Sequence, residues 1–353
     1  MNRNHFDIIF VTNQPSFYKV RQWNEIAKRK KVLLVFLEWM EKDRNKDFVS
    51  EKPGFDYEVL PEGKWEGVRY LTSLLRRIDY NRLIIGGWDD LRLRVLPFIS
   101  NRRKNALLCE SSFYEYRLSF FKDLIKKIIL RRISVVYPSG LAQGRIFEFL
   151  GFKGEYRYTG GCGLLNYIEQ PVYQPRTEVK TFLYVGRLVE VKNLKMLIRV
   201  FNELPHLQLN IIGFGEQEDV LKTMAKENIK FLGAVENKRL SEYYQQADVY
   251  VLPSTFEPWG LVIEEALNNG TPVIVSDKVG CRDDLVTEET GLVFDHDSEQ
   301  SLLDAIVKMT NIDFHNHLRK HISTMDFKKR AQHQIDVFVE TRQNNTICQN
   351  SFR

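Results

Sequence analysis

Two glutamates, Glu257 and Glu265, stand where chemistry is most clearly indicated in this sequence. A short apolar run, 249–252, precedes Glu257, and a helical pattern, 261–268, contains Glu265. A carboxylate accepts two hydrogen bonds from neighbouring hydroxyls, so Glu265 suits a ribose and Glu257 a hexose. The alternative is an acid favoured by the helix dipole, with a second glutamate facing solvent.

The residues between the glutamates predict a tight entry into that helix. Pro258 and Gly260 shape the turn, because glycine lets the backbone approach a ligand closely. The first amides of a helix have no partner within it and attract a phosphate or a sugar oxygen. We therefore expect the amides of Gly260, Leu261 and Val262 to face a ligand.

Two cations follow the strand predicted at 181–185. Arg187 comes directly after Gly186, and Lys192 lies just before the helical pattern at 194–202. A guanidinium fork and an ammonium group can neutralise a diphosphate and stabilise it as a leaving group without a metal ion. The alternative is a pair of ordinary surface cations.

A glycine pair, Gly213 and Gly215, follows the next predicted strand. It resembles half of a dinucleotide fingerprint, but Glu218 stands where the third glycine would be. A tight strand-to-helix turn explains the pair as well as a ligand contact does. An oxidoreductase that uses a dinucleotide is therefore a weak alternative.

Acidic residues also follow predicted strands in the first half of the chain. Asp89 and Glu110 are placed to hold an acceptor hydroxyl or to take its proton. A helix cap or a loop salt bridge is the competing interpretation for each. Three histidines, His315, His317 and His321, are expected on a solvated helix surface, since no metal-ligand pattern surrounds them.

Short apolar strands alternate with helical stretches along the whole chain, which predicts the α/β class with parallel sheets. The strands are expected at 8–11, 31–37, 82–85, 106–109, 135–137, 181–185, 207–212, 229–232, 249–252, 272–276 and 291–294. The helices are expected at 17–28, 194–202, 217–227, 241–246, 261–268 and 299–309. Glycines and prolines at 160–175 mark a linker, so we predict one doubly wound domain at 1–170 and another at 171–325. Ligands of two such domains bind at the carboxyl ends of the strands, in a cleft between them.

Composition supports this organisation and restricts the class of protein. A chain of 353 residues with 43% hydrophobic and 27% charged residues is ordinary for a globular protein of two domains. Cys109, Cys162, Cys281 and Cys348 are scattered, which favours a reducing cytoplasm. No signal peptide or membrane-spanning run is expected, and the net charge of +5 is modest and does not suggest a nucleic-acid partner.

A basic amphipathic helix is predicted within 119–135. Its apolar residues, such as Phe120 and Ile128, alternate with cations such as Lys126, Lys127 and Arg131. Such a helix can lie on an anionic membrane surface. The alternative is a core-facing helix with a solvated basic side.

The segment 182–294 resembles glycosyltransferase family 4, a group of retaining enzymes with the GT-B fold. The similarity rests on GRLVEVKN, on the IIGFGE turn and on EPWGLVIEEALNNGTPVIVSD, which carries the E-x7-E motif of that family. The resemblance implies that Arg187 and Lys192 bind the donor diphosphate, and that Glu265 holds the ribose and Glu257 the sugar. It also implies that backbone amides around Trp259, Gly260 and Leu261 contact the sugar, and that no metal or other cofactor is needed.

The first half matches that family weakly. The loop after the first strand, NQPSFYKV, is not rich in glycine, and no histidine lies between His5 and His206. The resemblance suggests Glu110 as a polar residue beside the donor sugar. It further implies that the last segment, 326–353, carries a helix that crosses back to the first domain.

These observations predict a retaining glycosyltransferase. It would move a sugar from a nucleotide-diphosphate donor to a glycan or lipid-linked acceptor in bacterial surface polysaccharide biosynthesis (capsule, lipopolysaccharide or exopolysaccharide). We expect it in the cytoplasm, peripherally at the inner face of the plasma membrane. A non-catalytic partner subunit that binds a sugar nucleotide is the main alternative.

Overall fold

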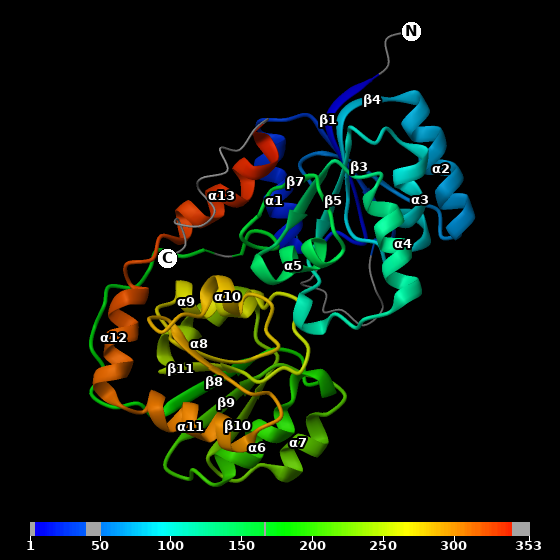
Figure 1. Ribbon diagram of the computed structural model, residues 1–353. Coiled ribbons are helices and arrows are strands. Elements are labelled where there is room, and N and C mark those ends of the chain that lie inside the picture. Colours follow the sequence, from blue (N-terminus) through cyan, green and yellow to red (C-terminus); the bar gives the residue numbers. More distant parts are fainter. Residues whose placement is uncertain (1–3, 40–50, 166, 341–353) are drawn as a thin grey trace. The chain divides into compact units, whose positions relative to one another are not determined.

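The computed structural model describes residues 4–39, 51–165 and 167–340 (Figure 1). The described residues pack as two units, one formed by those up to 164 with those from 329 onward, and the other by those between 165 and 328. Each unit is an α/β domain around a fully parallel sheet, as predicted from the alternating pattern. The division falls after Leu164, near the boundary predicted at 170.

The first unit contains a parallel sheet in the order β3-β2-β1-β4-β5-β6-β7. The chain starts in the middle of the sheet, winds outward through β2 and β3, and then returns to β4 beside β1. Helices lie between most of the strands, which keeps both faces of the central strands away from water. The strands are β1 (His5–Thr12), β2 (Val32–Phe36), β3 (Asp56–Val59), β4 (Asp79–Ile85), β5 (Asn105–Cys109), β6 (Val135–Pro138) and β7 (Glu155–Tyr156). The helices between them are α1 (Phe17–Ala27), α2 (Lys64–Arg77), α3 (Leu91–Ile99), α4 (Phe120–Leu130) and α5 (Leu141–Phe149), with a 3-10 turn at Phe113–Glu115.

The second unit repeats this winding with the order β10-β9-β8-β11-β12-β13. Its strands are β8 (Thr181–Val185), β9 (Gln208–Ile212), β10 (Ile229–Gly233), β11 (Val249–Leu252), β12 (Val273–Ser276) and β13 (Gly291–Phe294). Its helices are α6 (Leu194–Asn202), α7 (Glu218–Met224), α8 (Leu240–Gln246), α9 (Leu261–Asn268), α10 (Arg282–Leu285), α11 (Glu299–Met309) and α12 (Ile312–Ile322). Two 3-10 turns, η3 (Glu190–Lys192) and η4 (Asn237–Arg239), precede α6 and α8. The winding reverses between β8 and β11, which are neighbours in the sheet.

The last helix, α13 (Phe327–Val339), packs on the first unit from Lys329 onward. The side-chain oxygen of Gln334 accepts a hydrogen bond from the Gly163 amide at 3.1 Å. The backbone carbonyl of Gln334 accepts one from the Gln22 side chain at 3.0 Å. Residues 341–353, which include Cys348, lie outside the described part of the chain.

The histidine expectation was wrong for His315. This side chain is fully buried, and its Nε2 atom lies 2.9 Å from the Asp248 carbonyl oxygen. Burial lowers the pKa of His315, which keeps the ring neutral in the core. Within the described ranges, no helix is long and apolar enough to cross a bilayer.

Candidate functional site

The predicted site residues of the second unit gather where its sheet reverses direction. Gly186 and Arg187 follow β8, and the loop that contains Glu257 follows β11, the neighbouring strand. The carboxyl ends of two such strands form a crevice because the connecting helices leave in opposite directions.

Glu257 and Lys192 form an ion pair in the structure. Each side chain is only 14% exposed, so the pair is largely shielded from water. The Ser254 hydroxyl lies 3.5 Å from the same carboxylate oxygen. The 3-10 turn that carries Lys192 is attached to the Glu257 loop, since the Thr255 amide donates to the Val191 carbonyl at 2.9 Å. Lys192, which is expected to bind a phosphate, and Glu257, which is expected to bind a sugar, are therefore in direct contact.

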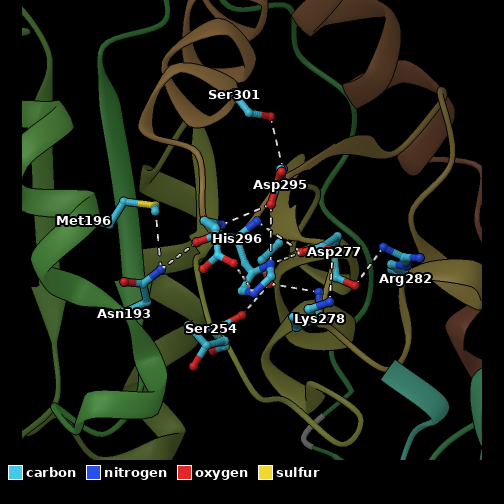
Figure 2. A network of polar contacts seen from close by, with 12 residues as sticks. Asn193, Met196, Ser254, Asp277, Lys278, Arg282, Asp295, His296 and Ser301 are labelled. Atoms are coloured by element: carbon cyan, nitrogen blue, oxygen red, sulfur yellow. Dashed lines mark hydrogen bonds and ion pairs between the residues drawn. The ribbon is translucent and has the colours of Figure 1, made fainter. Parts of the chain in front are cut away.

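A polar cluster at the ends of β12 and β13 contacts the residue that follows this 3-10 turn (Figure 2). Asn193 adopts a left-handed conformation with φ 55°, and its side chain donates to the His296 carbonyl at 3.1 Å. The His296 ring and amide contact Asp277 Oδ1 at 2.8 and 3.1 Å. Lys278 Nζ lies 3.3 Å from the other oxygen of Asp277. Because Asn193 directly follows Lys192, the cluster helps to fix where that ammonium group lies.

Three groups of this cluster, on Asp277, Asp295 and His296, lie close enough to hold a metal ion. It is the one such group within the described ranges. Its ligand atoms already have protein partners, because His296 and Lys278 occupy both oxygens of Asp277. We therefore interpret the cluster as a scaffold for the loop.

Arg187 differs from Lys192 in its surroundings. Its side chain is exposed and has no hydrogen bond or ion pair with any residue of the described ranges. Its carbonyl accepts a bond of 2.9 Å from the buried Tyr184 hydroxyl. Burial and then Glu257 raise the pKa of Tyr184, while Arg187 lowers it, so these charges act on one another. Arg187 is thus a cation available for an anionic ligand.

The glycines of this region are required by close backbone packing. A Cβ atom on Gly213, where φ is 141°, would lie 1.8 Å from the Gly186 carbonyl oxygen. A Cβ atom on Gly215 would lie 2.4 Å from the Leu188 carbonyl oxygen. The Leu188 amide donates to the Phe214 carbonyl at 2.9 Å, which joins the two turns. This packing accounts for glycine at both positions, and a ligand contact of Gly213 and Gly215 stays a prediction.

Glu265 lies in α9 and accepts a hydrogen bond from the Tyr244 hydroxyl at 3.0 Å. Burial raises the pKa of Glu265 to about 7, the Tyr244 bond opposes this, and Glu264 adds to it. In its ionised form this carboxylate can accept a hydrogen bond from each hydroxyl of a ribose diol.

The structure adds a residue that the sequence analysis missed. Glu264 is fully buried and accepts bonds from Trp259 Nε1 at 2.7 Å and from the Tyr167 hydroxyl at 3.1 Å. Trp259 is only 3% exposed, so its ring is fixed inside the protein. A signal existed in the sequence, because Glu264 occupies a position of α9 between apolar residues that face the core.

The loop around Trp259 is further held by its own backbone. Gly260 has φ 102°, a conformation that glycine adopts without strain. The Trp259 carbonyl accepts from the Cys281 amide, and the Glu257 carbonyl from the Gly280 amide, both at 2.9 Å. Pro258 and Leu261 flank this segment, and the first amides of α9 have no acceptor within the helix. The loop therefore presents amides at a defined place beside Glu257.

The two candidates in the first unit differ, because Glu110 has an ionic partner and Asp89 is exposed. Glu110 forms an ion pair of 2.9 Å with Lys19. Burial lowers the pKa of Lys19, but Glu110 and Tyr18 together raise it above its ordinary value, so that the amine stays charged. Asp89 is exposed, and the helix cap suggested for it is made by Asp90, whose carboxylate accepts from the Arg92 amide at 2.7 Å. Glu110 is therefore not a free base here.

Parts of the chain are similar in sequence to known glycosyltransferases. Residues 168–333 match the family model for glycosyl transferases group 1. An uncharacterised glycosyltransferase of Methanocaldococcus jannaschii is 36% identical over 121 residues, which are 32% of this chain and 31% of that protein. The chain thus matches about a third of the length of that relative. The lipopolysaccharide core biosynthesis glycosyltransferase LpsE of Rhizobium meliloti is 28% identical over 52% of this chain and 53% of its own.

Solved structures share the fold over nearly the whole chain. Sucrose-phosphate synthase from Thermosynechococcus elongatus superposes with a TM-score of 0.72 at 20% identity, covering 94% of this chain and 96% of that one. The Anabaena protein HepE, solved with UDP and glucose, gives 0.68 at 16% identity, covering 95% and 97%. Residues 168–333 are thus similar to the glycosyl transferases group 1 family, and the chain shares the GT-B fold of its structural neighbours.

Proposed function

We propose that this protein transfers a sugar from a nucleotide-diphosphate donor, with retention of anomeric configuration and without a metal ion. The observation that supports this most is the grouping of Arg187, Lys192 and Glu257 at the carboxyl ends of β8 and β11. The group 1 match covers these elements, and HepE, with the same fold, was solved with UDP and glucose.

The roles in this proposal follow from charge and position. The free guanidinium of Arg187 and the ammonium group of Lys192 would neutralise the diphosphate as negative charge develops on it. Glu257 would keep Lys192 in place and accept a bond from a sugar hydroxyl. Glu265, with its pKa near 7, would hold the ribose. The amides of Trp259, Gly260 and Leu261 would contact the sugar.

The two glutamates would then orient the donor and would not act as acid and base. In a front-side reaction the leaving phosphate itself helps to take the acceptor proton. This path suits a site made of cations and helix amides, since both stabilise the departing diphosphate.

The acceptor in this proposal is a glycan or a lipid-linked glycan of a bacterial surface polysaccharide. The similarity to LpsE, which its name assigns to lipopolysaccharide core biosynthesis, supports that class. A lipid-linked acceptor would require the protein to reach the inner face of the plasma membrane, and the basic helix α4 is the candidate for that contact.

Thermal stabilisation by a panel of nucleotide sugars tests the donor part of the proposal. A ligand that binds the folded state raises the melting temperature with its concentration. We expect one donor to stabilise the wild type and to lose that effect in Glu265→Ala. Glu288→Ala, which changes an exposed glutamate of the same unit, serves as the control. Equal stabilisation of all three proteins would show that Glu265 does not hold the donor.

A non-catalytic sugar-nucleotide-binding subunit is the second candidate, and the Lys19–Glu110 pair favours it. This pair leaves Glu110 without the freedom of a general base. Release of free nucleoside diphosphate by the purified protein with an acceptor extract separates the two. Donor binding without release would support the subunit.

A further inference from the structure

The first unit has a cavity at the edge of its sheet where the strands begin. Its volume is about 600 Å³, and its walls come from 102–103, 127–134 and 150–154. These segments precede β5, β6 and β7, respectively. Ligands of open parallel sheets bind at the opposite edge, where the strands end. The cavity is therefore distinct from any site at the carboxyl ends of these strands.

The charge of this cavity is its main feature. Five cations line it, and within the described part of the chain no carboxylate does. None of the five has an ion pair with a described acid. They are Arg102, Arg103, Lys127, Arg131 and Lys153. Cations that share one cavity repel each other, so an anion bound among them relieves that repulsion.

Neighbouring cations of the same sequence clusters have structural roles. Arg132 donates to the carbonyls of Pro97 at 3.2 Å and Ser100 at 3.3 Å. Lys126 lies over the Tyr116 ring, 4.2 Å from its centre, and Lys104 bonds the Tyr80 carbonyl. The fold thus uses some of the basic residues internally and leaves those of the cavity for a ligand.

Helix α4, labelled in Figure 1, adds an apolar surface to this charge. Phe120 and Phe121 are 78% and 76% exposed, and Leu124, Ile125 and Ile128 are exposed as well. Their spacing places them on one face of the helix. Lys127 and Arg131 follow Leu124 at steps of three and four residues, so the cavity cations extend the apolar row.

We propose that this cavity binds the phosphate-bearing headgroup of an anionic lipid while the exposed face of α4 enters the membrane beside it. A soluble polyanion would satisfy the cations but would leave the exposed phenylalanines in water. A bilayer with anionic lipids satisfies both, because basic residues bind its surface charge and apolar side chains enter its interface. This inference rests on the membrane contact in the proposed function and gives it a lipid class and a binding site.

Sedimentation of the full chain with lipid vesicles tests the proposal. The wild type should bind phosphatidylcholine vesicles that contain phosphatidylglycerol and should not bind pure phosphatidylcholine. The variant Arg103→Gln, Lys127→Gln, Arg131→Gln should bind on the order of 100-fold more weakly, since each basic residue at an anionic surface contributes about fivefold. The matched control, Arg69→Gln, Arg76→Gln, Arg77→Gln on α2, loses equal charge from exposed positions and should bind nearly as the wild type does.

A second variant, Phe120→Ser with Phe121→Ser, should also lose vesicle binding while its circular dichroism spectrum stays unchanged. Equal losses in both glutamine variants would overturn the proposal, because net charge alone would then explain binding. Binding of glycerol phosphate without binding of vesicles would overturn the lipid assignment. Stabilisation by a nucleotide sugar is measured on the same proteins. A wild type that binds the donor but no vesicle would refute this inference and leave the proposed function intact.

Discussion

The Lys192–Glu257 pair offers a quantitative test of the site. Replacing Lys192 by Met removes the cation and leaves the Glu257 carboxylate in a place where it is 14% exposed. Among the described residues, the Ser254 hydroxyl at 3.5 Å then remains as its side-chain hydrogen-bond partner. Exposed pairs contribute up to about 1 kcal/mol, and breaking fully buried ones costs about 3–5 kcal/mol. We expect a coupling energy of about 2 kcal/mol for this intermediate case.

A double-mutant cycle measures that coupling. Urea unfolding of the wild type, Lys192→Met, Glu257→Gln and the double variant gives the four free energies. The double variant should be more stable than the sum of the single effects predicts, because it leaves no unpaired charge. A coupling below about 0.5 kcal/mol would refute the reasoning, since the pair would then behave like one on the surface.

The same variants separate stability from donor binding. Lys192→Met should weaken binding of a nucleoside diphosphate by about 30-fold, which corresponds to about 2 kcal/mol. Binding of the nucleoside alone, which has no phosphate, should change little. Equal losses for both ligands would mean that Lys192 shapes the site without contacting the phosphates.

Three further predictions follow from the geometry. Because the pKa of Glu265 is raised, the folded state binds this proton more tightly than the unfolded chain does. The resulting stabilisation is complete below the ordinary pKa of 4.5 and is lost as the pH rises through about 7. Glu265→Gln should therefore gain stability over the wild type at about pH 8 but not at about pH 4, and a parallel pH profile for both proteins would contradict this. Gly213→Ala should lower the free energy of unfolding by about 3 kcal/mol or more, because the new Cβ atom meets the Gly186 carbonyl. Gly233→Ala has open space around its Cβ atom at φ 69° and should lower it by about 1 kcal/mol. Urea unfolding measures both values. Glu264→Gln should shift the tryptophan emission maximum, because the substitution weakens the hydrogen bond that Trp259 Nε1 donates to the Glu264 carboxylate. Glu288→Gln is the matched control. An unchanged spectrum of Glu264→Gln would indicate that another acceptor replaces the carboxylate.

The elements of the second unit were predicted closely from sequence. The predicted helices at 194–202, 261–268 and 299–309 agree with α6, α9 and α11, and β8, β11 and β13 have the predicted bounds. These strands are short apolar runs bounded by turn residues, and that pattern indicates a buried strand. In the first unit β3 and β7 were missed. β3 is a mostly exposed strand with two acids, and β7 has two residues, so neither shows an apolar run.

The sequence by itself determined the α/β class and which residue types follow the strands of the second unit. Those properties follow from apolar periodicity and from strand ends, which are local features of the chain. Only the tertiary structure decided how these residues are paired. It joined Lys192 to Glu257 and Glu110 to Lys19, and it left the Arg187 guanidinium without a partner in the described chain. Each pair joins residues far apart in sequence, so the charge state and availability of a side chain depend on neighbours that no local pattern specifies.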